Sequence, residues 1–199
     1  MKIRKELKLF TFHGAPVVVH WSVLLAFPLG WAIEKSFLGA LVAQAAFLVL
    51  MLAHELGHAF VARRFRLPVY SIELYAIHGL CRHGAPHREG ADIAIAWGGV
   101  LAQGILFALV LLLAKGLNVS GGIPRTLAPA FDVWVPLNML IAFCNLLPIP
   151  PLDGAKAWRV IPLGFSRLVQ RVTQRTRRRP SAGHVVSMEL DRIRKREVK

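Results

Sequence analysis

The pentapeptide His54-Glu55-Leu56-Gly57-His58 has the residue types and the spacing to hold and use a metal ion. On a helix, residues four positions apart fall on one face, so both imidazoles can bind a single zinc ion. Glu55 then addresses the remaining coordination site. The pattern therefore indicates hydrolytic chemistry at a zinc centre. The alternative is a pair of core histidines on an ordinary helix.

The zinc motif lies inside an apolar run that is long enough to cross a bilayer. The chain has 199 residues, of which 55% are hydrophobic, and its mean hydropathy is +0.49. A helix needs about 20 apolar residues to cross some 30 Å of hydrocarbon. We therefore predict an all-α polytopic membrane protein with about four transmembrane helices, and we place these at residues 17–33, 37–62, 93–114 and 131–147. A tight helical hairpin is predicted at 34–36.

The basic residues predict the orientation of these helices. The net charge is +14, and all but three of the 25 Lys and Arg residues fall on one side of the predicted membrane. The exceptions are Lys35, Lys115 and Arg125. Because positive charge favours the cytoplasmic side, we expect both termini in the cytoplasm of a bacterial or archaeal cell, with the zinc motif near the inner face. This distribution fits lipid headgroups better than nucleic acid, which we do not expect as a partner.

A small cytoplasmic β element is expected between the second and third helices. Residues 68–75 are rich in β-branched and aromatic side chains and are followed by Gly79, which predicts a strand and then a turn. An exposed strand edge beside a hydrolytic zinc site could hold an extended peptide by strand addition. A small hairpin without a substrate role is equally consistent with the pattern.

The third zinc ligand must come from another part of the chain, because hydrolytic zinc sites usually have three protein ligands. Asp153 is the best of the cytoplasmic acidic residues, since it directly follows the fourth predicted helix. Three prolines at 148, 150 and 151 end that helix, and Gly154 permits a sharp turn. The other candidates are Glu73, Glu89 and Asp92.

Together, the two motifs resemble the site-2 protease family of intramembrane zinc metalloproteases. The zinc motif on one membrane helix is followed, on a later helix, by the run Asn145-Leu-Leu-Pro-Ile-Pro-Pro-Leu-Asp153-Gly154. The resemblance implies an enzyme, a zinc metalloendopeptidase that cleaves transmembrane proteins near the cytoplasmic face. It implies that His54, His58 and Asp153 are the zinc ligands, that Glu55 is the general base and that Asn145 holds substrate. Departures such as Trp97-Gly98-Gly99 remove no ligand.

Residues 1–162 are predicted to form the membrane-embedded protease domain, in a minimal form without appended domains, and residues 163–199 a basic cytoplasmic tail. The tail favours contact with anionic lipids, although a solvated tail with a purely topological role is the alternative. His78, Cys81, His83 and His87 form a dense run that could hold a second metal or be a polar loop. Cys81 and Cys144 are expected to be free thiols.

Two other functions remain open on the sequence alone. One is a membrane protein that retains the metal site without turnover. The other is a metal transporter, for which intramembrane His and Asp residues are also natural. A transporter has no need of Glu55 between the histidines, and it predicts metal flux instead of peptidase activity.

Overall fold

The computed structural model describes residues 6–119, 122–164, 166 and 170. The chain divides into two units, Met1–Trp158 and Arg159–Lys199, and the elements discussed below lie in the first. The basic tail predicted for residues 163–199 lies almost entirely outside the described residues. Its contact with lipid and the domain boundary at residue 162 therefore stay predictions.

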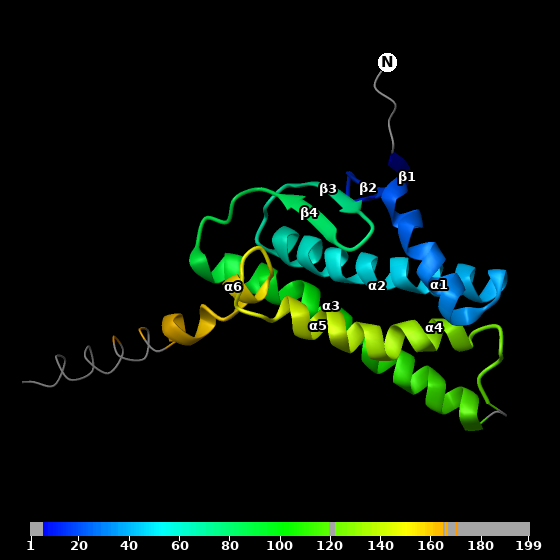
Figure 1. Ribbon diagram of the computed structural model, residues 1–199. Coiled ribbons are helices and arrows are strands. Elements are labelled where there is room, and N and C mark those ends of the chain that lie inside the picture. Colours follow the sequence, from blue (N-terminus) through cyan, green and yellow to red (C-terminus); the bar gives the residue numbers. More distant parts are fainter. Residues whose placement is uncertain (1–5, 120–121, 165, 167–169, 171–199) are drawn as a thin grey trace, which may run out of the picture. The chain divides into compact units, whose positions relative to one another are not determined.

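One four-stranded sheet covers part of the helical layer (Figure 1). Its neighbouring strands are either antiparallel hairpins (the first and last pairs) or parallel (the middle pair). In spatial order, which is also chain order, they are β1 (Glu6–Phe12), β2 (Ala15–His20), β3 (Val69–Leu74) and β4 (Gly79–His83).

The N-terminal half of this sheet differs from the sequence expectation. Residues 17–20, which the sequence analysis places in the first membrane helix, belong to β2. A short apolar run of valines suits a buried strand as well as a helix, and here pairing of Val17 with Ile72, both fully buried, decides for the strand. His13 and Gly14 join β1 to β2 with φ values of 48° and 88°, as a two-residue hairpin turn requires.

The predicted strand at 68–75 is present as β3, but the turn is misplaced. Gly79 begins β4, and the reversal lies between Tyr75 and His78, where the Tyr75 amide donates to the His78 carbonyl at 3.0 Å. The small β element between the second and third long helices is thus a hairpin, joined to the N-terminal strands in one sheet.

The first helical hairpin begins with a 3₁₀ helix, η1 (Trp21–Ala26), and continues as α1 (Phe27–Glu34). Lys35 takes the left-handed conformation with φ 54°, and the Ser36 hydroxyl accepts from the Gly39 amide at 3.0 Å to cap the next helix. That helix is α2 (Phe37–Arg64). The connection at 34–36 therefore lies where the sequence predicts it.

Only two of the four predicted spans appear as single long apolar helices in the described part of the chain. These are α2 and the part of α3 (Glu89–Val119) that ends at Leu117. The fourth predicted span is broken into α4 (Ala128–Asp132), a π-helical turn η2 (Val133–Leu137) and α5 (Asn138–Asn145). Pro136 lies inside η2, and because proline lacks an amide donor it disturbs the regular α-helical pattern there.

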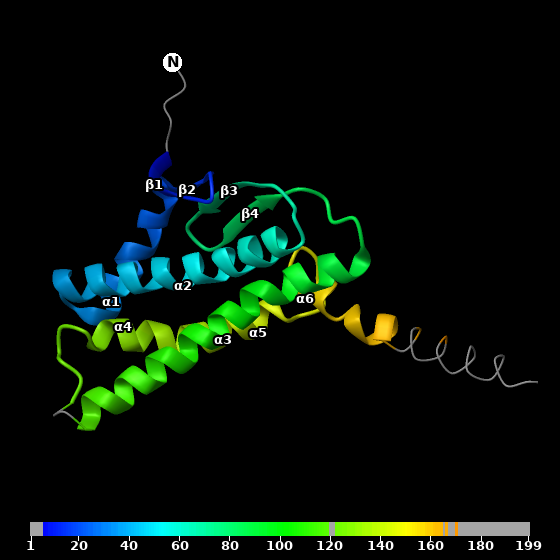
Figure 2. The same cartoon turned by 180° about the vertical axis from the view of Figure 1, so that it is seen from behind.

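The helix α2 lies between the sheet on one side and α3 on the other, and both views show this arrangement (Figures 1 and 2). On the sheet side, Met51, Ala59 and Ala62 join Val17 and Ile72 in the buried core. On the other side α2 and α3 approach closely. A Cβ placed on Gly57 would overlap the Gly98 carbonyl, so only glycine permits this packing. The close approach brings α3 against the zinc motif.

Candidate metal centre

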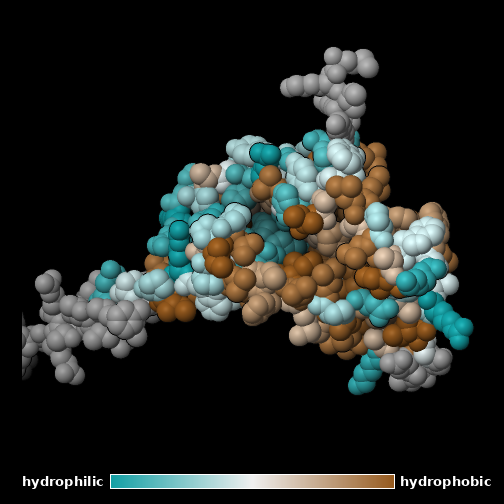
Figure 3. All heavy atoms as spheres, in the orientation of Figure 1, coloured by the Kyte–Doolittle hydropathy of each residue, from teal (hydrophilic) through white to brown (hydrophobic). Residues whose placement is uncertain are grey.

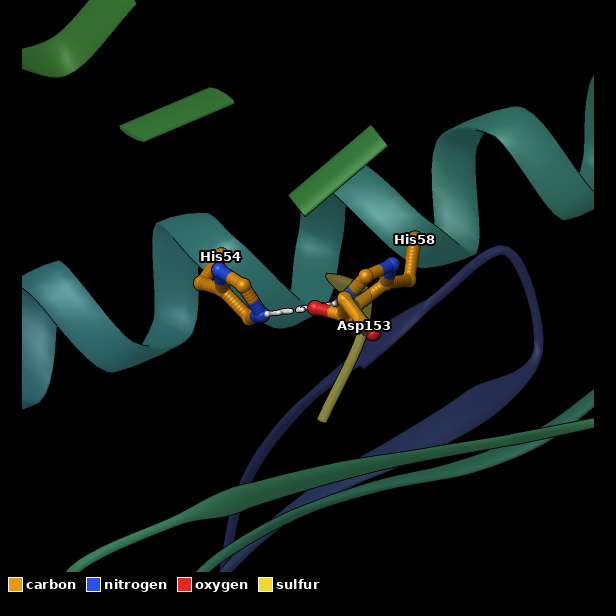
Figure 4. Close-up of side chains that lie close together, drawn as sticks. All are labelled: His54, His58 and Asp153. Atoms are coloured by element: carbon orange, nitrogen blue, oxygen red, sulfur yellow. Dashed lines mark hydrogen bonds and ion pairs between the residues drawn. The ribbon is translucent and has the colours of Figure 1, made fainter. Parts of the chain in front are cut away.

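Three side chains with metal-ligand atoms, drawn from two distant parts of the chain, meet at one point (Figure 4). His54 and His58 lie on successive turns of α2, and Asp153 follows α5. Asp153 Oδ2 lies 3.0 Å from His54 Nε2 and 3.1 Å from His58 Nε2, and the two Nε2 atoms are 2.9 Å apart. Among the described residues, no other group of three or more His, Cys, Asp or Glu side chains could hold one ion.

The hydrogen bonds of the two imidazoles show that this donor set fits a cation. His58 Nδ1 lies 2.7 Å from the Ile95 carbonyl, which can only accept, so this nitrogen carries a proton. His54 Nδ1 donates to Gln103 Oε1 at 2.9 Å. In the neutral imidazoles the Nε2 lone pairs then face each other and the carboxylate, an arrangement that is repulsive unless a cation lies between them.

The spacing of the donor atoms also fits zinc. Zinc binds His nitrogen and carboxylate oxygen at about 2.0–2.2 Å, so tetrahedral ligand atoms lie about 3.3 Å apart. The three observed separations, 2.9, 3.0 and 3.1 Å, are close to that value. Two imidazoles and one carboxylate leave a fourth position for water or substrate, as catalytic zinc sites do.

The turn that carries Asp153 is fixed by backbone packing and by two tryptophans. Gly154 lies so close to the Leu146 and Leu147 carbonyls that a Cβ would overlap both. The Trp158 indole donates to the Leu146 carbonyl at 2.6 Å, and the Trp97 indole of α3 donates to the Ala157 carbonyl at 3.1 Å. These contacts tie the short helix α6 (Gly154–Ala157) back to α5 and α3, and they aim Asp153 at the histidines.

An ion pair at the edge of the cavity reinforces the same turn. Lys156 Nζ lies 3.1 Å from Asp92 Oδ1, which joins α6 to the first turn of α3. Asp92 was a candidate third ligand in the sequence, and the structure pairs it with Lys156 instead. Since half of the Lys156 side chain is exposed, the pair itself adds little stability, and its effect is mainly on geometry.

Glu55 is buried beside the histidines and lines the same cavity. Its carboxylate accepts a hydrogen bond from the backbone amide of Cys81 in β4. Gly79 lies against the same carboxylate, and a Cβ at that position would overlap Glu55 Oε1. The edge strand β4 therefore holds Glu55 in place through its backbone, and a side chain at position 79 would displace it.

The cavity around these residues has a volume of about 710 Å³. Asn145, at the end of α5, lines it with Nδ2 3.5 Å from His54 Nε2. The space-filling view shows hydrophilic side chains at the floor of a hollow on this face, with apolar surface beside it (Figure 3). A peptide of several residues could enter a cavity of this size.

The remaining candidate ligands from the sequence lie elsewhere. Partial burial acts to raise the pKa of Glu73, but hydrogen bonds from Arg82, Ser71 and Tyr75 outweigh it and lower that pKa. Glu73 therefore takes part in hydrogen bonds on the surface of the sheet and is not a ligand at the metal centre. Glu89 is exposed at the start of α3.

The dense run of His and Cys between 78 and 87 does not form a second metal group in the described structure. Cys81 lines the cavity beside Glu55, and burial together with the charge of Glu55 raises the pKa of its thiol to about 12. The thiol is therefore protonated at neutral pH. Cys81 and Cys144 are both free, as the sequence predicts.

Three positions on α3 that shape the centre were not among the site residues predicted from the sequence. Ile95 and Gln103 accept the Nδ1 protons of the two histidines, and Gly99 lies directly over their Nε2 atoms. A signal for Gln103 was present, because a polar side chain inside an apolar span indicates a partner within the protein. No signal identified Ile95, which contributes only its carbonyl.

The chain is similar in sequence to several proteins named as zinc metalloproteases. No protein-family model matches the chain. A zinc metalloprotease of Methanocaldococcus jannaschii is 26% identical over 160 residues, which cover 78% of this chain and 45% of that protein. Rip3 of Mycobacterium tuberculosis, assigned as a zinc metalloprotease, is 33% identical over 175 residues, 79% of this chain and 44% of Rip3. The chain thus spans about half the length of these curated relatives.

A shorter relative and a solved structure agree with them. YwhC of Bacillus subtilis, also assigned as a zinc metalloprotease, is 32% identical over 133 residues, 51% of this chain and 60% of YwhC. The fold matches that of a site-2 protease from Methanocaldococcus jannaschii with a TM-score of 0.58 and 24% identity, covering 78% of this chain and 71% of that one.

The similar proteins and the three metal-ligand side chains indicate that the chain is a zinc metalloprotease-like protein with apolar helices. They also support zinc as the metal. Within that class, the fold is similar to that of a site-2 protease.

Proposed function

We propose that the chain is an intramembrane zinc metalloprotease that hydrolyses peptide bonds of transmembrane proteins near the cytoplasmic face. The observation that carries the proposal is the convergence of His54, His58 and Asp153 within 3.1 Å of one another, in a cavity that Glu55 also lines. In this proposal the first three residues bind zinc, and Glu55 is the general base. Asn145 holds substrate beside the metal.

The chemistry follows from the positions of these groups. Zinc bound by the three ligands would supply a water of near-neutral pKa and a Lewis acid for the substrate carbonyl. Glu55, oriented by the Cys81 amide, takes the proton of the attacking water and delivers it to the leaving amine. Asn145 can donate through Nδ2 to a substrate carbonyl in the same cavity. Glu55 is buried, which limits the access of bulk water to this transfer.

A membrane location is supported by two helices, α2 and α3, that have the length and composition to cross a bilayer. We propose four crossings, of which the first uses the apolar stretch Trp21–Glu34 and the last uses α4, η2 and α5 in succession. The three basic residues Arg63, Arg64 and Arg66 follow the zinc motif closely, which favours placing this end of α2 at the cytoplasmic face.

Substrates of such a site must present extended backbone, because a transmembrane helix hides its peptide bonds in hydrogen bonds. The edge strand β4 borders the cavity and is paired on one side by β3, so it suits addition of an extended substrate strand. We therefore expect substrates with helix-weakening residues near the cleaved bond. Replacing a helix-weakening glycine of the substrate by leucine should slow cleavage by the purified enzyme. Equal cleavage of both substrate forms would contradict this expectation.

The test of the proposal separates the metal ligands from the base. In purified full-length protein, Glu55→Gln should keep zinc at the wild-type stoichiometry and lose cleavage, because general-base catalysis contributes about 10²–10⁴-fold. Glu89→Gln, at an exposed position on α3, is the matched control and should leave both unchanged. Substrates are found by comparing membrane-protein fragments in cells that carry the wild type or Glu55→Gln.

The outcomes distinguish the alternative functions as well. Zinc retention without fragments that depend on Glu55 would indicate a protein that keeps the metal site but has no turnover. Zinc flux into liposomes that persists in Glu55→Gln would indicate a transporter. Loss of zinc from Glu55→Gln with full retention in Asp153→Ala would show that the ligand assignment is wrong.

A further inference from the structure

Three residues on one face of α3 lie against the two histidines, and each contributes differently to the metal centre. Ile95, Gly99 and Gln103 are spaced four residues apart, so they share one face of the helix. Ile95 offers a backbone carbonyl to His58 Nδ1, Gly99 leaves room for the Nε2 atoms, and Gln103 offers a side-chain oxygen to His54 Nδ1. Of the two histidine contacts, only the second depends on the identity of a side chain.

We propose that Gln103 is a positioning residue that fixes the tautomer and the ring orientation of His54 and thereby sets the affinity of the centre for zinc. The inference rests on the metal site of the proposed function. When Gln103 Oε1 accepts from Nδ1, the proton of the neutral imidazole is held there, and Nε2 presents its lone pair toward His58 and Asp153. The opposite amide orientation would place the proton on Nε2, where it excludes a metal ion.

The burial of Gln103 argues against a role in packing alone. Its side chain is fully buried, and its Nε2 is without a hydrogen-bond partner. An unpaired buried amide group destabilises a fold, so an apolar residue of similar size would pack at least as well at this position. What a methionine could not supply is the oxygen that accepts from His54.

The backbone at this position is held from a third helix. Asn138, almost fully buried in α5, donates from Nδ2 to the Gln103 carbonyl at 3.1 Å. The same helix ends at Asn145 and leads to the turn that carries Asp153. Gln103 therefore lies where α2, α3 and α5 meet, and its oxygen is fixed relative to the zinc ligands of both segments.

The experiment measures metal binding by the full-length chain in detergent, with zinc affinity from chelator competition and the visible absorption spectrum of the cobalt-substituted protein. Gln103→Met should weaken zinc binding about 10–100-fold, the usual effect of losing a partner of a ligating histidine, and should change the cobalt spectrum. The thermal stability of its metal-free form should be unchanged or higher. Gln103→Glu, which restores an acceptor oxygen, should recover most of the affinity.

The matched control is Gln44→Met, because Gln44 is also a buried glutamine with an unpartnered Nε2 on α2, ten positions before His54. It should bind zinc like the wild type. Wild-type affinity and an unchanged cobalt spectrum in Gln103→Met would overturn the inference while leaving the proposed function intact. If Gln103→Met does not fold, Gln103→Glu decides, since a loss of zinc as large as that of Asp153→Ala would equally overturn it. Failure of the wild type itself to bind zinc would instead contradict the proposed function.

Discussion

Replacing Gly99 by alanine should damage the metal centre through one added methyl group. The new Cβ would lie 2.5 Å from His58 Nε2 and 2.7 Å from His54 Nε2, whereas ordinary contacts begin at 3.4 Å. The rings or the helix would therefore have to move by about 0.7–0.9 Å, since the overlap is relieved only at ordinary contact distance. Metal sites tolerate errors of only about 0.2 Å in ligand distances.

The surroundings give the methyl group little room. Both rings are tied through Nδ1 to Ile95 and Gln103, and α3 is pressed against α2 where Gly98 meets Gly57. Overpacking of this kind typically costs about 1–3 kcal/mol. If the cost is expressed only when metal binds, zinc affinity falls about 5–150-fold. We expect the upper part of that range, because neither the rings nor the helix can shift alone.

The assay is zinc affinity by chelator competition, with thermal unfolding of the metal-free protein measured in parallel. Gly104→Ala is the matched control, since Gly104 lies on the same helix and a Cβ there meets nothing within 4 Å. The control should bind zinc like the wild type. Wild-type zinc affinity in Gly99→Ala would refute the geometry of the centre described above.

Four further predictions test other features of the structure. Asp153→Ala should weaken zinc binding by more than the roughly 10–100-fold that is typical when a partner of a ligand is lost, because it removes a direct ligand. Zinc affinity is measured by chelator competition for the variant and the wild type. Equal affinities would contradict this prediction. Cys81→Ala should keep activity, since Glu55 is held by the backbone amide of residue 81 and not by the thiol. With a thiol pKa of about 12, Cys81 should react with maleimide slowly at pH 8 and faster as pH rises, and rapid pH-independent labelling would be the contrary result. Glu73→Gln should lower the melting temperature at pH 7, and the difference should vanish in acid. A carboxyl with a lowered folded pKa stabilises above its unfolded pKa, about 4.3, and loses that contribution as pH falls through the lower folded value. An equal melting temperature at pH 7 would show that the hydrogen bonds of Glu73 contribute nothing.

The candidate site could be predicted from sequence because its chemistry is encoded locally. His54, Glu55 and His58 need only a helix to take their places, and that helix is indicated by a long apolar run. Asp153 needed one further step, in which a proline-rich turn was placed beside the motif. The structure brings these residues together as the sequence suggests, and their roles are what the proposed experiments test.

The parts that were missed depend on which segments become neighbours. The sequence around Val17 is compatible with a helix or a strand, and only its pairing with β3 decides between them. The break at Pro136 depends on how the last apolar stretch packs. The role of Gln103 likewise follows only from the pairing of α3 with α2, which the glycines at 57 and 98 permit. Local pattern identified the ligands, whereas tertiary packing identified what holds them.

The most direct test of the central claim is X-ray absorption of the zinc-loaded full-length protein and of Asp153→Ala. We predict one zinc per chain with two imidazole nitrogens and one carboxylate oxygen at about 2.0–2.2 Å, and loss of the carboxylate in the variant. A zinc environment without two imidazoles, or one that is identical in Asp153→Ala, would contradict the account.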